Sequence, residues 1–151
     1  MTNTLSPSAR EHIFGLITTG PFASHVGLSV DKAEVDYVII RMPGGDHIMN
    51  GVGIAHGGAL ATLIDTAATA AAWASSDVKD TTRGTTVALT INYLSGAPQT
   101  DLVAEGRVIS RGGTLTIIDV TAHTADGKQT IAKAQVTYKL DLARDRRLAR
   151  T

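Results

Sequence analysis

The sequence predicts an α+β fold in which one curved antiparallel sheet wraps around one long central helix. An alanine-rich apolar stretch at residues 57–74 has helical spacing, and four segments in which apolar and polar residues alternate follow it. Short turns join these segments, whereas parallel neighbours would need crossovers of a dozen residues or more. We therefore expect an antiparallel meander packed on the helix.

A short amphipathic helix is expected first, at about residues 7–19. Ser6 is a preferred helix cap, and Pro7 suits the first helical position because its missing N–H would have no partner there. Gly20-Pro21 ends this helix. A hairpin or strand pair is expected over residues 26–42, in which Val35, Tyr37 and Ile39 alternate with Asp36, Val38 and Ile40.

The helix at residues 57–74 is apolar on nearly all sides, which is typical of a buried helix. Strands with a period of two are expected after it, at residues 86–93, 102–109, 115–124 and 130–140. Asp126-Gly127 is a strong hairpin signal between the last two strands. The core therefore covers about residues 22–140 of a single domain, and residues 141–151 form a charged tail.

Composition excludes several classes of function. Lys plus Arg and Asp plus Glu number 14 each, so no net charge favours nucleic acid or an anionic membrane surface as a partner. Cysteine is absent, which excludes disulfides, thiolate zinc sites and a cysteine nucleophile. No signal peptide or membrane span is visible, and we expect a cytoplasmic protein.

Asp65 is the most informative residue of the central helix. It is the only residue with a formal charge between His47 and Ser76. A helical aspartate ordinarily faces water, but the residues on its face are uncharged and no larger than threonine. These residues are Ala61, Thr62, Ala68 and Thr69. Burial of a lone carboxylate raises its pKa, and a protein that keeps such a group usually uses it, so the sequence predicts a catalytic carboxylate here.

His56-Gly57-Gly58 stands where this helix begins. Backbone N–H groups at a helix start lack helical partners and carry partial positive charge, so they suit a developing oxyanion. A plain loop-to-helix junction would have the same composition. Asn50 either donates its side-chain amide to a substrate carbonyl or forms hydrogen bonds with the backbone of its own loop. Thr86 is by default an ordinary strand residue.

Other types of site fit less well. His47, His56 and Asp65 have no recognised metal-ligand spacing, and we prefer a structural histidine at position 56 to a metal ligand. Residues 51–56 resemble a dinucleotide fingerprint, but the third glycine falls one residue late and no βαβ unit follows. No nucleophile-elbow or Walker sequence is present.

The chain resembles the hotdog-fold acyl-CoA thioesterases in the spacing Asn50-x5-His56-Gly57-Gly58-x6-Asp65, followed by a meander. The similarity covers about residues 22–140 and includes Asn92-Tyr93-Leu94. A sister branch tends to carry glutamate at the acid position. Aspartate therefore favours the branch named after the phenylacetate-degradation thioesterase PaaI.

The resemblance implies a role for each matching residue. Asp65 activates water or attacks the thioester, the N–H of Gly57 donates to the thioester oxygen, Asn50 assists, and Thr86 helps to orient the water. No cofactor is implied, because coenzyme A is part of the substrate. The resemblance also implies a homodimer, commonly paired into a homotetramer.

Candidates for contacts with the rest of the substrate are less specific. Gly58 adjoins the N–H donor, and Arg83, Arg111 and Lys133 are cations on or beside the meander that could meet the coenzyme A phosphates. Each cation is otherwise an ordinary solvated side chain.

The spacing of Gly57 and Asp65 requires more than one chain. The two residues are eight positions apart, which separates them by about 12 Å along one helix. Both must lie within hydrogen-bonding distance of adjacent parts of one thioester. We therefore predict that Gly57 of one chain works with Asp65 of the partner subunit, which gives two equivalent sites per dimer.

Two other functions stay open. A hotdog hydratase or dehydratase would act on enoyl- or hydroxyacyl thioesters with His56 in the acid–base role, and product analysis with an enoyl-CoA would separate it. A non-catalytic acyl-CoA binding module would bind ligand and release no thiol.

Overall fold

The computed structural model of the chain describes residues 3–142. Its helices are α1 (Pro7–His12), which continues into a π-helical turn (Ile13–Ile17), α2 (Pro21–Val26) and α3 (Gly57–Trp73), with a short 3₁₀ turn (Asp46–Ile48) before α3. Its strands are β1 (Ser29–Glu34), β2 (Tyr37–Met42), β3 (Gly84–Tyr93), β4 (Leu102–Arg111), β5 (Leu115–Thr124) and β6 (Thr130–Leu140). From residue 143 onward, the expected charged tail lies outside the described residues.

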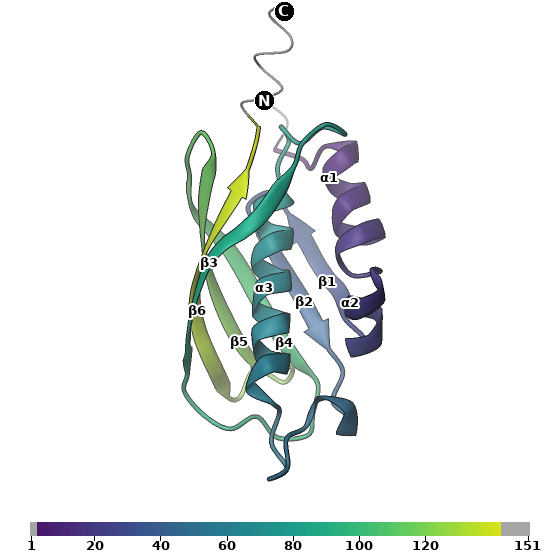
Figure 1. The fold of residues 1–151 in the computed structure, drawn as a ribbon, viewed down its shortest axis with the longest axis vertical. Coiled ribbons are helices and arrows are strands. Elements are labelled where there is room, and N and C mark those ends of the chain that lie inside the picture. Colours follow the sequence, from purple (N-terminus) through teal and green to yellow (C-terminus); the bar gives the residue numbers. More distant parts are fainter. Residues whose placement is uncertain (1–2, 143–151) are drawn as a thin grey trace, which may run out of the picture.

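The six strands form one antiparallel sheet in the order β1-β2-β4-β5-β6-β3. The sheet curves around α3, and α1 and α2 lie beside α3 over the end of the sheet that contains β1 (Figure 1). The predicted α+β fold, with one long helix inside a curved antiparallel sheet, is confirmed.

The order of neighbouring strands differs from a simple meander. β4, β5 and β6 follow one another, but β3 pairs with β6, and β4 pairs with β2. Residues 94–101 pass beneath the N-terminal end of α3 between β3 and β4 (Figure 1). Eight residues can span up to about 27 Å, whereas the three strand spacings from β3 to β4 need only about 14 Å. This loop therefore carries the chain across the sheet and leaves β3 at an edge.

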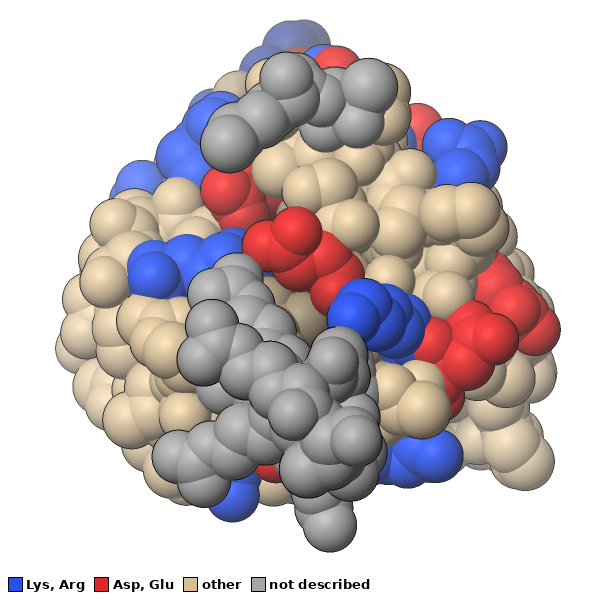
Figure 2. Space-filling model, turned by 90° about the horizontal axis from the view of Figure 1, so that it is seen from above, with Lys and Arg blue, Asp and Glu red and all other residues tan. Residues whose placement is uncertain are grey.

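Charges of both signs are interspersed on the end of the molecule where α3 finishes. Lysine, arginine and acidic side chains alternate over this face (Figure 2). This mixture agrees with the equal numbers of basic and acidic residues in the sequence. In the part of the chain that the structure describes, no helix is long and apolar enough to cross a membrane.

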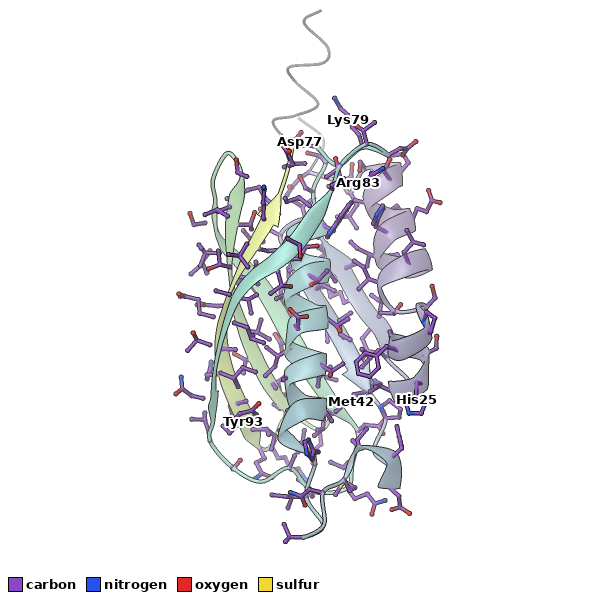
Figure 3. All side chains as sticks on the ribbon, viewed as in Figure 1. His25, Met42, Asp77, Lys79, Arg83 and Tyr93 are labelled. Atoms are coloured by element: carbon purple, nitrogen blue, oxygen red, sulfur yellow. The ribbon has the colours of Figure 1, made fainter. Side chains whose placement is uncertain are left out.

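The core lies between α3 and the inner face of the sheet. Buried side chains from both, Met42 of β2 among them, fill this space (Figure 3). The alternation predicted for β6 is confirmed: Ala132, Val136 and Tyr138 are buried, whereas Lys133, Gln135 and Lys139 are exposed. Trp73 at the end of α3 donates its indole N–H to the hydroxyl of Tyr138 at 2.9 Å.

One local expectation is incomplete and one is wrong. Gly20-Pro21 follows the end of the first helix, as expected, but Pro21 also begins α2, whose six residues are too few to show helical periodicity in the sequence. Val35 and Asp36 form the turn between β1 and β2 and are not part of one alternating strand. Asp36 has a φ of 62°, a left-handed conformation that aspartate visits more readily than most residues.

Arg111 connects the turn between β1 and β2 to the C-terminal end of α3. Its guanidinium donates to Asp36 Oδ1 at 2.6 Å and to the carbonyl of Ala72 at 3.0 Å. The backbone N–H of Asp36 donates to the carbonyl of Ala74 at 2.8 Å. The last carbonyls of a helix lack helical partners, so these bonds satisfy groups that the helix itself leaves open.

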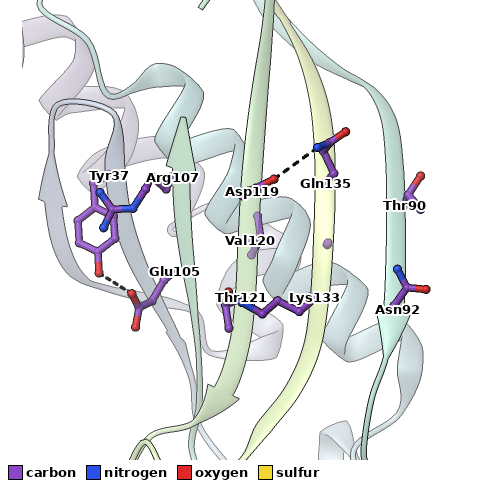
Figure 4. A pocket seen from close by; sticks show the side chains of 11 residues that line it. Tyr37, Thr90, Asn92, Glu105, Arg107, Asp119, Val120, Thr121, Lys133 and Gln135 are labelled. Carbon is purple, nitrogen blue, oxygen red and sulfur yellow. Dashed lines mark hydrogen bonds between the residues drawn. The ribbon is translucent and has the colours of Figure 1, made fainter. Parts of the chain in front are cut away.

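The outer face of the sheet, away from α3, is hollowed. The hollow has a volume of about 450 Å³ and runs across β2, β4, β5, β6 and β3 (Figure 4). Tyr37 donates to Glu105 there at 2.6 Å, and the guanidinium carbon of Arg107 lies 4.3 Å from the centre of the Tyr37 ring. His123 Nε2 lies 2.9 Å from the other oxygen of Glu105. These polar groups therefore satisfy one another.

This network shifts two pKa values. The hydrogen bond from Tyr37, and next the one from His123, hold the pKa of Glu105 below its ordinary value of 4.5. Burial, and next the hydrogen bond to Glu105, raise the pKa of Tyr37 to about 12. At neutral pH the phenol is therefore protonated and the carboxylate is ionised, which is the combination that the hydrogen bond requires.

Gly106 on β4 allows α3 to approach the sheet closely. A Cβ at this position would lie 2.6 Å from the carbonyl oxygen of Ala67 and 3.2 Å from the Cβ of Ala71. Both neighbours belong to the buried face of α3. Any side chain at position 106 would therefore push the helix away from the sheet.

We expect Gly106→Ala to lower the free energy of unfolding by about 1–3 kcal/mol, because the new methyl group overpacks the helix–sheet contact. Urea denaturation at one fixed protein concentration would measure the change. Gly113→Ala is the matched control, since a Cβ there meets no atom within 4 Å. Equal stability of the two variants would show that α3 tolerates displacement from the sheet.

We expect Glu105→Gln to destabilise the protein at neutral pH by roughly 1 kcal/mol, because the partly exposed network is screened by solvent. The folded-state pKa of Glu105 lies below its unfolded value, so the contribution is full above the unfolded value and is lost as the pH falls through the folded value. Unfolding curves from neutral pH to about pH 3 should show the two proteins converging. Glu34→Gln, which alters an exposed ion pair with Lys32, is the control, and a pH-independent difference would contradict the assignment.

Candidate active site

Asp65 lies in the middle of α3 and is held by β3. The hydroxyl of Thr86 donates to Asp65 Oδ1 at 2.8 Å. Thr86 is on the inner face of β3, because it pairs with Tyr138, which is buried against α3. The two residues that the sequence singled out on different elements are therefore in direct contact. No described residue donates to the second carboxylate oxygen, Oδ2.

The burial of Asp65 differs from the expectation of a dry helical interior. Its side chain is half-buried, on a strip of α3 that is less buried than the rest of the helix. The same strip includes Ala61, Thr62, Thr66 and Thr69. The hydroxyls of Thr62 and Thr66 donate to helix carbonyls four residues earlier. Because α3 contains so many small alanine and threonine residues, it was expected to be buried on all sides. In the single chain, however, one strip of the helix is open.

Hydrogen bonding at the start of α3 leaves one N–H group unused. The N–H of His56 donates to the carbonyl of Ile48 at 2.7 Å, and the N–H of Gly58 donates to Nδ1 of the His56 ring at 2.9 Å. Among the described residues, no acceptor meets the N–H of Gly57 between them. This group is thus the available donor at the helix start, whereas the N–H of Gly58, a predicted substrate contact, is already engaged.

Asn50 has a fixed orientation in the loop before α3. Its Oδ1 accepts hydrogen bonds from the N–H groups of Val52 at 3.0 Å and Ile54 at 3.2 Å. This arrangement satisfies the loop and also leaves the side-chain NH₂ without an acceptor among the described residues. Both readings of Asn50 from the sequence, a loop-satisfying residue and an amide donor, are compatible with this geometry.

Asn50 and Gly57 line one hollow of about 340 Å³ at the N-terminal end of α3. Its other lining residues are Ile54, Ala55, Leu60, Tyr93, Leu94, Ser95, Gly96 and Ala97. Tyr93 donates its hydroxyl to the carbonyl of Gly57 at 3.0 Å. Tyr93 was not predicted as a site residue, because in the sequence it is one apolar position of an alternating strand.

The candidate residues form two separate groups in one chain. Asp65 and Thr86 meet at the middle of α3, whereas Asn50, His56 and Gly57 gather at its first turn. Asp65 does not line the hollow that contains Gly57. The larger hollow on the outer face of the sheet contains neither group.

The predicted phosphate contacts lie away from the first turn of α3. Figure 3 places Arg83 at the opposite end of the molecule from Tyr93. Its guanidinium donates to the carbonyls of Asp80 and Thr82, both at 2.8 Å. Arg111 is engaged at the end of α3, and Lys133 donates to Thr121 on the outer face. A substrate-binding role for Arg83 and Arg111 stays a prediction.

His56 acts as the cap of α3. Because Nδ1 accepts the N–H of Gly58, this nitrogen carries no proton in the structure. Nε2 of the same ring has no partner among the described residues. No group of three or more histidine, aspartate or glutamate side chains in the described chain is arranged to hold a metal ion.

Known proteins are similar to this chain in sequence. Residues 52–131, more than half of the chain, match the family described as Thioesterase superfamily. The esterase candidate SSO1253 of Saccharolobus solfataricus is 32% identical over 114 residues, which cover 75% of this chain and 73% of that protein.

Solved structures show the same fold. The PaaI protein from the phenylacetic acid degradation operon of E. coli is 21% identical with a TM-score of 0.77, over 90% of this chain and 95% of that one. A Streptococcus mutans protein solved with bound acetyl-CoA is 27% identical with a TM-score of 0.66, over 75% of this chain and 87% of that one. On the family match and on its identity to the Saccharolobus protein, the chain belongs to the thioesterase superfamily and is a thioester hydrolase.

Proposed function

We propose that the protein hydrolyses an acyl-CoA to a free acid and coenzyme A, at a site shared by two copies of the chain. The observation that carries the proposal is the contact between Thr86 and Asp65 on the half-buried strip of α3. It holds one carboxylate oxygen and leaves the other able to accept a proton from water. The acetyl-CoA bound to the Streptococcus mutans relative supports this class of substrate.

Asp65 supplies the base or the nucleophile in this mechanism. As a base, Asp65 takes a proton from water while the water oxygen attacks the thioester carbonyl carbon. As a nucleophile, it forms an anhydride that water then cleaves. In both courses the C–S bond breaks with departure of a thiolate, which leaves readily without a strong acid. Thr86 orients the carboxylate in either case.

The N–H of Gly57 and the amide of Asn50 stabilise the oxyanion. A single donor of this kind commonly contributes about 3–4 kcal/mol of transition-state stabilisation. A Cβ at position 57 would come no closer than 3.6 Å to Tyr93, so packing within the chain does not require glycine there. Glycine instead leaves space for a substrate carbonyl to approach the backbone.

The two groups must come from different chains. α3 is one continuous helix from Gly57 to Trp73, so its rise keeps Gly57 and Asp65 about 12 Å apart along the axis. A two-fold axis can bring the first turn of one α3 to Asp65 of the partner subunit. The same contact would cover the open strip around Asp65 and separate it from bulk solvent.

β3 supports this pairing because it is an unprotected edge strand. Its ten residues, Gly84–Tyr93, include no charged side chain and no proline. Val87 and Leu89 are 56% and 37% exposed, respectively. The other edge, β1, is shorter and carries Lys32 and Glu34, whereas each of the two edge strands contains one register shift. Edge strands without such protection pair with other chains, and we assign the dimer contact to β3.

We further propose a cytoplasmic location, as fits a substrate built on coenzyme A. Association of two dimers into a homotetramer, which the family resemblance implies, stays a prediction.

Asp65→Asn should abolish most thiol release and leave the fold intact. The amide cannot act as a base or a nucleophile, and such groups contribute about 10²–10⁴ to the rate. Thiol detection with short, long and aromatic acyl-CoAs would measure turnover, and circular dichroism would check folding. Asp119→Asn, on the outer face of the sheet, is the matched control and should keep wild-type turnover. Near-normal turnover of Asp65→Asn would remove this residue from the mechanism, and ligand binding without thiol release by the wild type would identify a binding module.

Mixed dimers test whether the site is shared. Asp65→Asn and Asn50→Ala should each be inactive, and refolding them together at equal amounts should restore about a quarter of wild-type activity. Half of the dimers are then mixed, and each mixed dimer has one site with both residues intact. Two single-subunit sites would give no restoration, since every chain would carry one defect.

A further inference from the structure

We propose that Tyr93 is a positioning residue that fixes the first turn of α3, so that the N–H of Gly57 stays directed at the thioester oxygen. The inference rests on the proposed role of Gly57 and adds the residue that makes this donor rigid. Tyr93 is on β3, and its hydroxyl reaches across to the carbonyl of Gly57 at 3.0 Å. It lies at the N-terminal end of α3 (Figure 3).

The peptide unit between Gly57 and Gly58 is held at both ends. Tyr93 binds its carbonyl oxygen, and Nδ1 of His56 accepts its N–H at 2.9 Å. The ring of Tyr93 also packs beside Gly57, at 3.6–3.8 Å from the place of a Cβ. The orientation of this peptide is therefore set by two side chains from different elements.

The preceding peptide unit, which carries the N–H of Gly57, is held at its carbonyl. The carbonyl of His56 accepts the N–H groups of Ala59 at 2.9 Å and Leu60 at 3.1 Å. Of the four polar groups in these two peptide units, only the N–H of Gly57 has no acceptor among the described residues. This pattern is expected of a donor kept for a ligand.

The first turn of α3 needs a contact that fixes its backbone, because two glycines begin the helix. Glycine has the greatest backbone freedom of any residue, and the first turn of a helix is where fraying starts. A catalytic group displaced by about 1 Å can lose a large part of its effect. Tyr93 restores the rigidity that glycine at positions 57 and 58 gives up, and leaves the surface open to substrate.

The test is Tyr93→Phe in the full-length protein, which removes the hydroxyl and keeps the ring. We expect kcat to fall about tenfold with little change in KM, because the donor acts in the transition state more than in substrate binding. Backbone amide exchange at Gly58, whose N–H is hydrogen-bonded to His56, should become faster in the same variant. Tyr37→Phe is the matched control: it removes one tyrosine hydroxyl bonded to Glu105 on the outer face and should keep wild-type kcat.

The outcomes separate this inference from the proposed function. Wild-type kcat and unchanged amide exchange in Tyr93→Phe would overturn the positioning role, although thioester hydrolysis would stand. A raised KM with unchanged kcat would also overturn it, since it would make Tyr93 a substrate contact. Absence of thiol release by the wild type would instead refute the proposed function, and the amide exchange would still report whether Tyr93 rigidifies the helix start.

Discussion

The close contact between α3 and the sheet at Gly106 is the constraint on which the rest of the structure depends. The helix can lie inside the curved sheet only because the facing positions are small: Gly106 on β4 and Ala67 and Ala71 on α3. This contact determines which side of α3 is buried and therefore turns Asp65 toward β3. Arg111 then holds the far end of the helix to the turn between β1 and β2.

The length of α3 also separates the two groups of residues that the proposed reaction needs. One chain contains a carboxylate with its orienting hydroxyl at mid-helix and a backbone donor with its asparagine at the helix start. Nothing within the chain can bring the two groups together, because helix geometry fixes their separation. The N–H of Gly57 and Oδ2 of Asp65, which the proposal assigns to the reaction, have no hydrogen-bond partner among the described residues. In the proposed dimer, two-fold symmetry brings together two groups that a single helix keeps apart.

The sequence predicted what depends on local pattern. The alternation in β6 and the apolar run of α3 each determine one element, because burial of one side chain in every two, or of most of a helix, leaves a direct trace in residue order. The neighbours of β3 could not be found this way, since residues 94–101 are long enough to reach several places in the sheet. α2 was missed because six residues do not complete two helical turns.

The site was predicted only in part, because its contacts also depend on how distant elements pack together. Thr86 and Asp65 are 21 positions apart, and the family resemblance suggested both, but their contact depends on how β3 lies across α3. The openness of the strip around Asp65 could not be predicted, because alanine and threonine fit both a buried interface and an open groove. Tyr93 could not be predicted as a site residue, because an alternating tyrosine is usually a core residue and its hydrogen bond to Gly57 exists only in the folded chain.

The uncharged edge of β3 has a consequence for a chain that has not yet entered the proposed dimer. A folded single chain presents the free edge of a ten-residue strand with exposed Val87 and Leu89, and such an edge can template aggregation with any other extended segment. In the proposed dimer, association with an identical chain would remove that hazard. Charges placed on this strand to improve solubility would therefore protect the solitary chain at the expense of its ability to find a partner.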